Sequence, residues 1–238
     1  MHAKKGAVFE DPDLLSCRQC PRLVLHREEV ARVKRRAFQD QDYWGRPVAT
    51  FGDPRARLVI VGLAPAAHGA NRTGRMFTGD RSGDFLYAAL HRAGLASQPA
   101  SVARDDGLTL RDVAITAPVR CAPPGNRPTR DEIEACEGFL VRDLSRLIRA
   151  RVYLCLGRIG HESFLRVCRG SHPGLSPGKL PFSHGAVHTL PDGKWLVDSY
   201  HVSQQNTFTG RLTPESFDRV LCNARELAQG DEGRGTKS

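Results

Sequence analysis

Apolar and polar residues alternate along the chain in blocks that predict strands and helices in turn. Dense apolar runs, typical of strands buried in a parallel sheet, occur at 58–63, 113–117, 152–156 and 195–197. Helical spacing of apolar residues follows at 85–93, 129–147 and 213–224. Thr129 and Glu132 have the spacing of a capping box, and Thr213-Pro214 is a typical helix start. The order predicts an α/β fold, a doubly wound three-layer sandwich with a central, mostly parallel four-stranded sheet.

Three segments do not follow this alternation. The first 49 residues are charged, include Cys17-Arg-Gln-Cys20, and contain a basic stretch at 27–36 that we interpret as a short helix. Residues 170–181 form a Gly/Pro-rich insertion, and residues 229–238 are charged and Gly-rich, as disordered tails are. We therefore expect a single domain over residues 1–228, followed by a disordered tail at 229–238.

The charge of the chain favours a polyanionic partner. Its 238 residues carry a formal net charge of +9 at neutral pH, which suits phosphate contacts, although an ordinary basic enzyme would look the same. A hydrophobic fraction of 40% is enough for a core and argues against general disorder. No apolar run has the length to cross a bilayer, and residues 1–10 lack a secretory apolar region, so a cytoplasmic protein without membrane contact is expected.

Three polar loops follow predicted strands and collect the unusual residues. Loop 1 (62–80), loop 2 (120–128) and loop 3 (201–211) come after the first, second and fourth strands. Ligands of open α/β sheets bind beyond the carboxyl ends of the strands. The sequence therefore predicts that chemistry takes place where these loops meet.

The amino-acid sequences of the three loops resemble those of a known family. Loop 1 reads GLAPAAHGANRTGRMFTGD, loop 2 reads RCAPPGNRP and loop 3 reads HVSQQNTFTGR. In this order they resemble the uracil-DNA glycosylase superfamily, and specifically family 5 (the UDGb type), from Cys17 to about Leu221. The resemblance implies a DNA glycosylase that flips uracil, and other deaminated bases such as hypoxanthine or xanthine, out of double- or single-stranded DNA. It would hydrolyse the N-glycosidic bond, leave an abasic site and so initiate base excision repair.

Other features of the sequence refine this expectation. The three loops contain no Lys that could form a Schiff base, which favours a monofunctional enzyme. Gly62, Ala66 and Ala67 are expected at the base pocket, and the two alanines stand where other branches of the superfamily place a water-activating Asp, Asn or Glu. The usual base of the first motif is therefore absent. We further expect a monomer.

Three residues are candidates for the chemistry. Cleavage builds positive charge on the sugar and negative charge on the departing base, so a site needs a carboxylate and a hydrogen-bond donor. Asp80 precedes a helix start and is the candidate carboxylate, with a purely structural helix cap as the alternative. His201 is the candidate donor to the base, or else a histidine that orders its loop. Asn126 is implied to position water, unless it serves only as a turn residue.

Further loop residues are candidates for binding DNA. Phe77 is expected to stack on the flipped base, with a core anchor as the alternative. Phe208 would wedge into the gap left in the duplex, or pack under its own loop. His68 would bind phosphate or sugar, or order loop 1. Phosphate contacts are expected from Ser203, Asn206, Arg72, Arg75, Arg127 and Arg211.

Four of the seven cysteines have positions that resemble a metal centre. Cys17, Cys20, Cys121 and Cys136 are similar in arrangement to the iron-sulfur ligands of families 4 and 5. The resemblance implies a [4Fe-4S] cluster that ties the N-terminal segment to the domain, whereas spacing alone leaves zinc open. Cys136 also lies on an apolar helix stripe, so a core thiol is its alternative role.

The rival functions explain less of the sequence. A non-catalytic metal-containing module that binds nucleic acid would account for the charge and the cysteines, but not for Phe77, Asp80 and His201 together. Another α/β enzyme is disfavoured because the chain has no P-loop, no paired zinc histidines on a helix and no base-deaminase signature.

Overall fold

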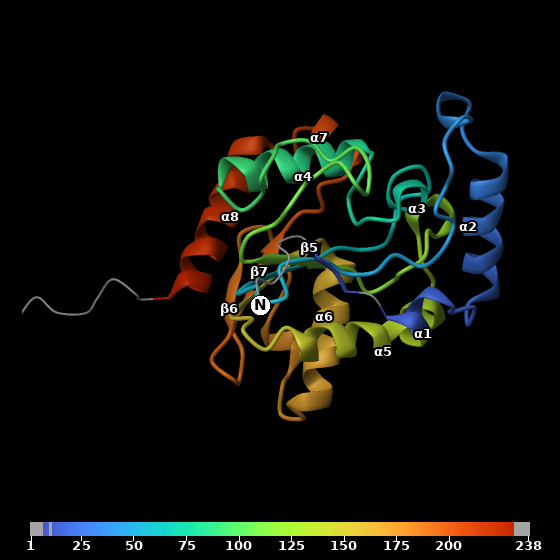
Figure 1. The fold of residues 1–238 in the computed structure, drawn as a ribbon. Coiled ribbons are helices and arrows are strands. Elements are labelled where there is room, and N and C mark those ends of the chain that lie inside the picture. The colour runs from blue at the N-terminus through green and yellow to red at the C-terminus, as the bar shows by residue number, and fades with distance from the viewer. Residues whose placement is uncertain (1–6, 10, 231–238) are drawn as a thin grey trace, which may run out of the picture.

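A computed structural model, which describes residues 7–9 and 11–230, shows an α/β sandwich built on one sheet (Figure 1). In this part of the chain the sheet has seven strands in the order β1-β2-β4-β3-β5-β7-β6. The strands are β1 (Ala7–Val8), β2 (Phe51–Gly52), β3 (Leu58–Val61), β4 (Val113–Thr116), β5 (Val152–Leu156), β6 (Val187–Thr189) and β7 (Trp195–Ser199).

The four predicted strands form the parallel centre of this sheet. Strand β3 pairs with β4 and β5, and β5 pairs with β7, all in parallel. The predicted fold class is confirmed, but the strand count of four was too low. Strands β1, β2 and β6 extend the sheet in antiparallel pairs. They are two or three residues long, too short for an apolar pattern to reveal them.

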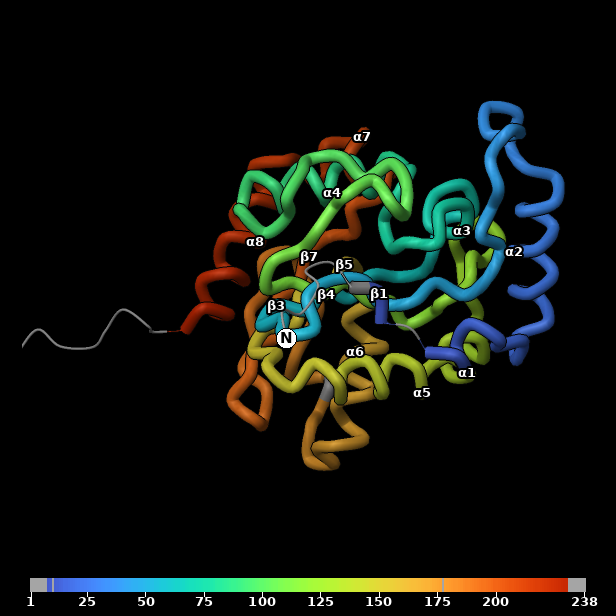
Figure 2. Tube along the Cα trace, viewed as in Figure 1, coloured from blue at the N-terminus to red at the C-terminus, as the bar shows by residue number. Residues whose placement is uncertain are grey.

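Helices cover both faces of the sheet. The helices are α1 (Pro12–Leu15), α2 (Pro21–Val33), α3 (Ala70–Thr73), α4 (Arg81–Arg92), α5 (Arg130–Arg146), α6 (Arg158–Ser171), α7 (Gln204–Phe208) and α8 (Pro214–Gln229), with short 3₁₀ turns η1 (Arg36–Phe38), η2 (Pro124–Asn126) and η3 (Pro177–Lys179). Helices α4 and α8 pack on one face, and α5 and α6 on the other (Figures 1 and 2). Helix α2 stands at the side of the domain, next to α3. None of the helices in the described ranges is long and apolar enough to cross a membrane.

The predicted elements at the ends of the chain differ slightly from the structure. The basic stretch at 27–36 falls in the second half of α2 and in η1, rather than in a separate helix. The tail was expected at 229–238, but Gln229 belongs to α8 and Gly230 is its C-cap. The rest of that expectation, at residues 231–238, lies outside the described residues. The insertion at 170–181 begins within the last turn of α6 and includes η3.

The chain leaves neighbouring strands in opposite directions at one point of the sheet. After β3 it passes to the face of α4, and after β5 it passes to the face of α6. At such a switch point two loops separate and leave a crevice at the carboxyl ends of the strands. Helix α6 begins tightly against this point, since a Cβ on Gly160 would come within 2.8 Å of the Gly62 carbonyl oxygen.

Candidate active site

The three predicted loops meet at this edge of the sheet around a cleft of about 690 Å³. Loop 1 contributes Ala66, Ala67, His68 and Asp80, loop 2 contributes Asn126, and Gln204 comes from loop 3. The α2 side of the domain adds Arg35, Phe38 and Gln41, which the sequence did not single out. Val102 lines it as well, so residues from five separate parts of the chain share one cleft.

Asp80 is the N-cap of α4, and its carboxylate is enclosed by the main chain of Gly69 and Gly83. Its Oδ1 accepts a hydrogen bond of 3.0 Å from the Gly83 amide. A Cβ on Gly69 would lie 1.8 Å from Oδ2, so only glycine leaves room for this carboxylate. Burial raises the pKa of Asp80, while amide hydrogen bonds and the Arg72 charge partly offset that rise. The helix cap and the chemical role predicted for Asp80 are thus compatible with each other.

Phe77 is held in a strained backbone conformation above the end of β3. Its φ of 52° lies in the left-handed region, which bulky residues rarely adopt without support. Two glycines supply that support: a Cβ on Gly62 would meet the ring at 3.0 Å, and one on Gly83 would meet the Phe77 carbonyl at 1.8 Å. The half-buried ring lies 6.1 Å from the His201 ring, centroid to centroid. Phe77 therefore connects loop 1 with loop 3.

His201 lies two residues after the end of β7, close to the predicted strand end. Desolvation by the surrounding chain lowers the pKa of His201 to about 4. Its main chain is fixed, because the Asn206 side-chain nitrogen donates to the His201 carbonyl over 2.8 Å. At neutral pH the ring is therefore an uncharged imidazole in a fixed place, able to donate one hydrogen bond.

This shift predicts how acid acts on stability. The folded-state pKa of about 4 lies below the ordinary 6.5, so His201 binds a proton less readily in the folded than in the unfolded chain. Its contribution, at most about 3 kcal/mol, is complete above pH 6.5 and is lost as the pH falls towards 4. We expect His201→Asn to lose less stability than wild type across that window in urea unfolding. His172→Asn, outside the cleft, is the matched control, and equal slopes for all three proteins would contradict the prediction.

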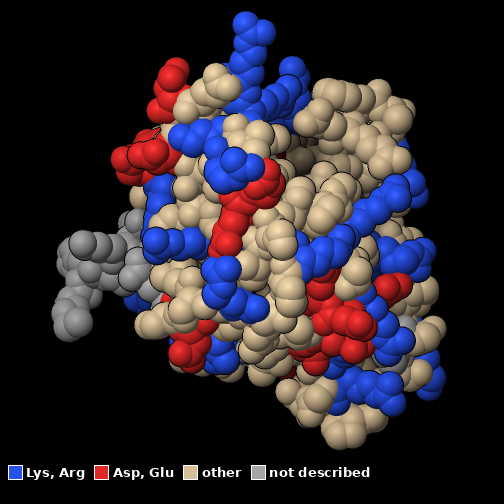
Figure 3. All heavy atoms as spheres, turned by 90° about the vertical axis from the view of Figure 1, so that its right-hand side faces the viewer, with Lys and Arg blue, Asp and Glu red and all other residues tan. Residues whose placement is uncertain are grey.

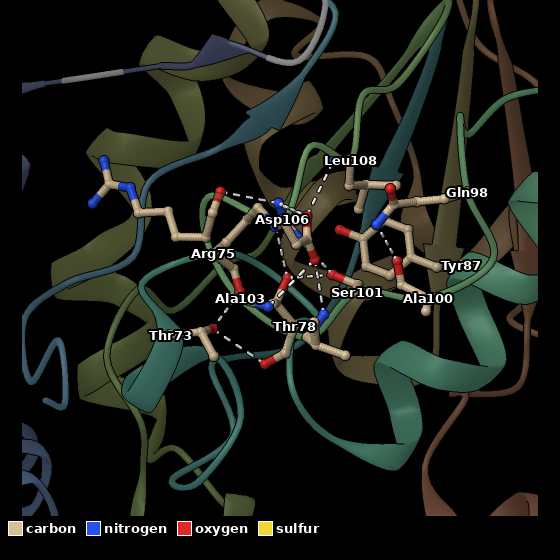
Figure 4. Close-up of polar contacts among 12 residues, drawn as sticks. Thr73, Arg75, Thr78, Tyr87, Gln98, Ala100, Ser101, Ala103, Asp106 and Leu108 are labelled. Atoms are coloured by element: carbon tan, nitrogen blue, oxygen red, sulfur yellow. Dashed lines mark hydrogen bonds and ion pairs between the residues drawn. The ribbon is translucent and has the colours of Figure 1, made fainter. Parts of the chain in front are cut away.

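Two arginines of loop 1 do not lie where the sequence placed them. Arg75 was expected at a phosphate-binding rim, but it is only 1% exposed and forms an ion pair of 2.8 Å with Asp106. Figure 4 shows it at the centre of a hydrogen-bonded group with Thr78 and Ser101. Buried and fully paired, Arg75 supports loop 1 from beneath, so the predicted phosphate contact is wrong.

Arg72 is likewise committed to the protein. Its guanidinium donates to the carbonyl oxygens of His68 and Gly79, each over 2.8 Å, and to the Gln41 side chain. It also covers the Phe38 ring at 4.0 Å. With 8% exposure it borders the cleft as a brace of loop 1 rather than as a free rim cation.

The remaining rim residues are exposed. Arg127 and Arg211 face solvent, and Arg211 lies 4.3 Å above the Tyr200 ring. Arg81, directly after Asp80, is exposed as well and approaches the ring of Phe208. Arg81 could have been predicted as a cleft residue from its place next to the N-cap Asp80. Arg35 could have been predicted from the basic stretch at 27–36.

Some predicted residues of loops 2 and 3 form hydrogen bonds within the protein, and others face solvent or the cleft. Phe208 is 68% exposed, so the alternative that it packs under its loop is wrong. The Asn206 side-chain nitrogen donates a hydrogen bond to the His201 carbonyl within the protein. Ser203 is the N-cap of α7 without a side-chain hydrogen bond of its own. Asn126 has a φ of 56°, typical of a turn, and yet borders the cleft, so both of its predicted roles fit.

The four cysteines singled out by the sequence surround one small apolar cavity away from the cleft. Cys17, Cys20, Cys121 and Cys136 all line it, together with apolar side chains from α1, α2 and α5. Arg27 donates to the Cys121 sulfur over 2.9 Å and to the Cys17 carbonyl over 3.0 Å. Among the described residues, no three Cys, His, Asp or Glu side chains have the arrangement that a single metal ion would need. The cavity is thus rich in thiols.

Comparison with known proteins agrees with the loops and the sheet. The model of the uracil DNA glycosylase superfamily matches residues 49–225. A type-5 uracil-DNA glycosylase of Mycobacterium leprae is 57% identical over 89% of this chain and 91% of its own length. Another of Thermus thermophilus is 55% identical over 90% and 95%, and a third of Pyrobaculum aerophilum is 44% identical over 89% and 88%. The chain therefore belongs to the uracil-DNA glycosylase superfamily, and within it to the type-5 branch.

Proposed function

We propose that this protein is a monofunctional glycosylase that removes uracil from DNA and leaves an abasic site. One observation carries the proposal: Asp80 borders the cleft, Phe77 lies three residues before it, and the Phe77 ring lies 6.1 Å from the His201 ring, centroid to centroid. Each of the three is held in place by glycines or main-chain hydrogen bonds. The similarity to type-5 uracil-DNA glycosylases supports the same activity.

The proposed reaction is a hydrolysis in which every group has a role. The bond between the sugar C1′ and the base nitrogen breaks, and its electron pair stays with the base. Ionised Asp80 stabilises the positive charge that grows on the sugar, and it accepts a proton from the water whose oxygen bonds to C1′. The neutral His201 ring donates a hydrogen bond to the base oxygen on which negative charge grows. Phe77 stacks on the flipped base and keeps it between these two groups.

The wall of the pocket favours a range of deaminated bases. Ala66 and Ala67 border the cleft with small apolar side chains, and neither can reject a base by charge or bulk. We infer activity on uracil opposite guanine, and weaker activity on hypoxanthine and xanthine. Asn126, on the opposite loop, would hold the attacking water.

The exposed residues around the cleft suit the DNA itself. Phe208 is exposed at the end of α7 and would fill the space that the flipped base leaves in the duplex. The exposed guanidinium groups of Arg81, Arg127 and Arg211 would contact the phosphate backbone.

The test is release of free uracil from a duplex that contains one uracil opposite guanine, followed by alkaline cleavage at the abasic site. We expect strand cleavage only after alkali, because the enzyme forms no Schiff base. Cleavage without alkali would refute the monofunctional mechanism. DNA binding without release of uracil, hypoxanthine or xanthine would instead favour the alternative, a nucleic-acid-binding module.

We further propose a [4Fe-4S] cluster on Cys17, Cys20, Cys121 and Cys136. The residues fit such a group, because four soft thiol donors line one apolar cavity, and the buried Arg27 places a positive charge beside Cys121. The chain's own part is to hold α1 and α2 against α5 through these ligands. The cluster lies apart from the cleft, so its role would be structural.

Iron and sulfide content tests this assignment. We expect the purified protein to contain about four irons per chain, with visible absorbance, and Cys136→Ser to lose most of both. Cys168→Ser, on α6 and outside the cavity, should retain them. Zinc without iron in the wild-type protein would contradict the cluster.

A further inference from the structure

Tyr43 lies behind His68 and links it to the α2 side of the domain. The Arg35 amide donates to the Tyr43 hydroxyl oxygen over 3.3 Å, and this oxygen lies 3.1 Å from Nδ1 of His68. The two rings meet edge to face, with centroids 6.1 Å apart. The Tyr43 hydroxyl thus contacts both the main chain of Arg35 and the ring of His68 in loop 1.

The hydrogen bonds of Tyr43 favour one of the two positions for the proton of His68. A main-chain amide can only donate, so the Tyr43 oxygen is an acceptor towards Arg35. The hydroxyl proton then needs an acceptor of its own. Among the described residues, His68 Nδ1 is the remaining polar partner of this hydroxyl. This arrangement favours a hydrogen bond from Tyr43 to Nδ1, with the proton of a neutral His68 ring on Nε2.

The surroundings keep His68 neutral and Tyr43 in place. Burial lowers the pKa of His68, and the charges of Arg35, Arg72 and His26 lower it further. The main chain after Tyr43 is hydrogen-bonded to α3, from Trp44 to the Arg72 carbonyl over 2.9 Å and from Gly45 to the Asn71 carbonyl over 3.0 Å. Tyr43 is therefore part of the rigid support of loop 1.

His68 and Arg35 both border the cleft that contains Asp80. Arg35 follows the end of α2 and is exposed. Figure 3, which looks onto this side of the molecule, shows blue Lys and Arg side chains projecting at the top. A neutral N–H donor next to an exposed guanidinium suits a phosphodiester, which offers two acceptor oxygens and one negative charge. A carboxylate partner for Arg35 does not occur among the ion pairs of the described residues.

We propose that Tyr43 is a positioning residue that keeps His68 in its Nε2–H tautomer and Arg35 beside it, so that the two bind a DNA phosphate at the edge of the cleft. The identity of the ligand rests on the proposed function. The tautomer does not, and can be measured without any substrate.

The first measurement is the His68 tautomer, from ¹⁵N and ¹³C shifts of histidine-labelled full-length protein. We expect Nε2–H in the wild type and in Tyr153→Phe, a matched control on the far face of the sheet, and a mixture of tautomers in Tyr43→Phe. A wild-type ring with its proton on Nδ1 would overturn the proposal.

The second measurement is binding of a duplex that carries an uncleavable abasic-site analogue. We expect Tyr43→Phe to weaken Kd about 3- to 10-fold, and to leave kcat at saturating uracil DNA unchanged. Arg35→Gln should lower the salt dependence of binding by about one phosphate contact, and the double variant should lose less than the product of the two effects. Wild-type affinity in Tyr43→Phe, or a fall in kcat without a change in Kd, would refute the proposed phosphate site at His68 and Arg35. Wild-type protein that binds this duplex but releases no uracil would refute the proposed function alone.

Discussion

Asp80→Asn is expected to lower kcat for uracil release by about 10²- to 10⁴-fold without loss of stability. The substitution removes the charge that faces the sugar. It keeps a good helix cap, because Asn accepts the Gly83 amide almost as well as Asp does. Single-turnover release from a uracil duplex measures the rate, and urea unfolding at neutral pH measures the stability.

The sign of the stability change follows from the pKa. Burial raises the pKa of Asp80 above 3.8, so the ionised carboxylate destabilises the folded chain at neutral pH. Its removal should leave stability equal or higher. Asp11 is a matched N-cap, on α1, whose pKa is lowered because hydrogen bonds from Leu14 and Arg142 outweigh desolvation. Asp11→Asn should therefore destabilise the chain and retain the chemical step. An active Asp80→Asn enzyme would remove Asp80 from the mechanism.

Asp106→Asn is expected to destabilise the protein by about 3–5 kcal/mol, the usual cost of breaking a buried ion pair. Arg75 would remain buried with an uncompensated charge, since its guanidinium makes two hydrogen bonds to Asp106 of 2.8 and 2.9 Å. The midpoint Tm should fall by about 2–4 °C for each kcal/mol. Because Arg75 also holds Thr78, the loss should extend to the segment between Phe77 and Asp80.

A surface pair provides the control. Asp218 pairs with Arg92 at 2.8 Å, but both are more than one third exposed, so Asp218→Asn should cost less than about 1 kcal/mol. The pH dependence gives a second check. Desolvation opposes ionisation of Asp106, but hydrogen bonds from Arg75, Leu108 and Val102 lower its pKa to about 2. Its stabilising effect is thus complete above pH 3.8 and is lost as the pH falls towards 2. Equal losses in Asp106→Asn and Asp218→Asn would show that the buried pair contributes little.

The sequence predicted the parts of the site that depend on local pattern. Asp80 and His201 could be placed because each borders an element with a clear start or end, and such positions in an α/β sheet lie at one edge. Strands β3, β4, β5 and β7 could be predicted because each is a dense apolar run, which is also a local pattern. The two-residue strands β1 and β2 have no such pattern of their own and form only because β4 offers an edge.

The sequence did not predict contacts between remote segments. Arg75 was assigned to DNA because its partner Asp106 lies 31 residues later, with nothing nearby in the chain to indicate burial. Tyr43 went unnoticed because its contact with His68 depends on how α2 and α3 pack against each other. A charged side chain in a polar loop is often interpreted as a ligand contact, when it can equally be the support beneath the loop.

The glycines packed around Phe77, Asp80 and the end of β3 have a consequence for engineering. Gly62, Gly69, Gly83 and Gly160 each bring bare main chain against a neighbour closely enough that a single methyl group would collide. At these four points the chain around the site therefore packs against bare main chain. A variant library that varies Ala66 and Ala67 would change which bases enter, whereas one that varies these glycines would mostly yield proteins with a displaced loop 1.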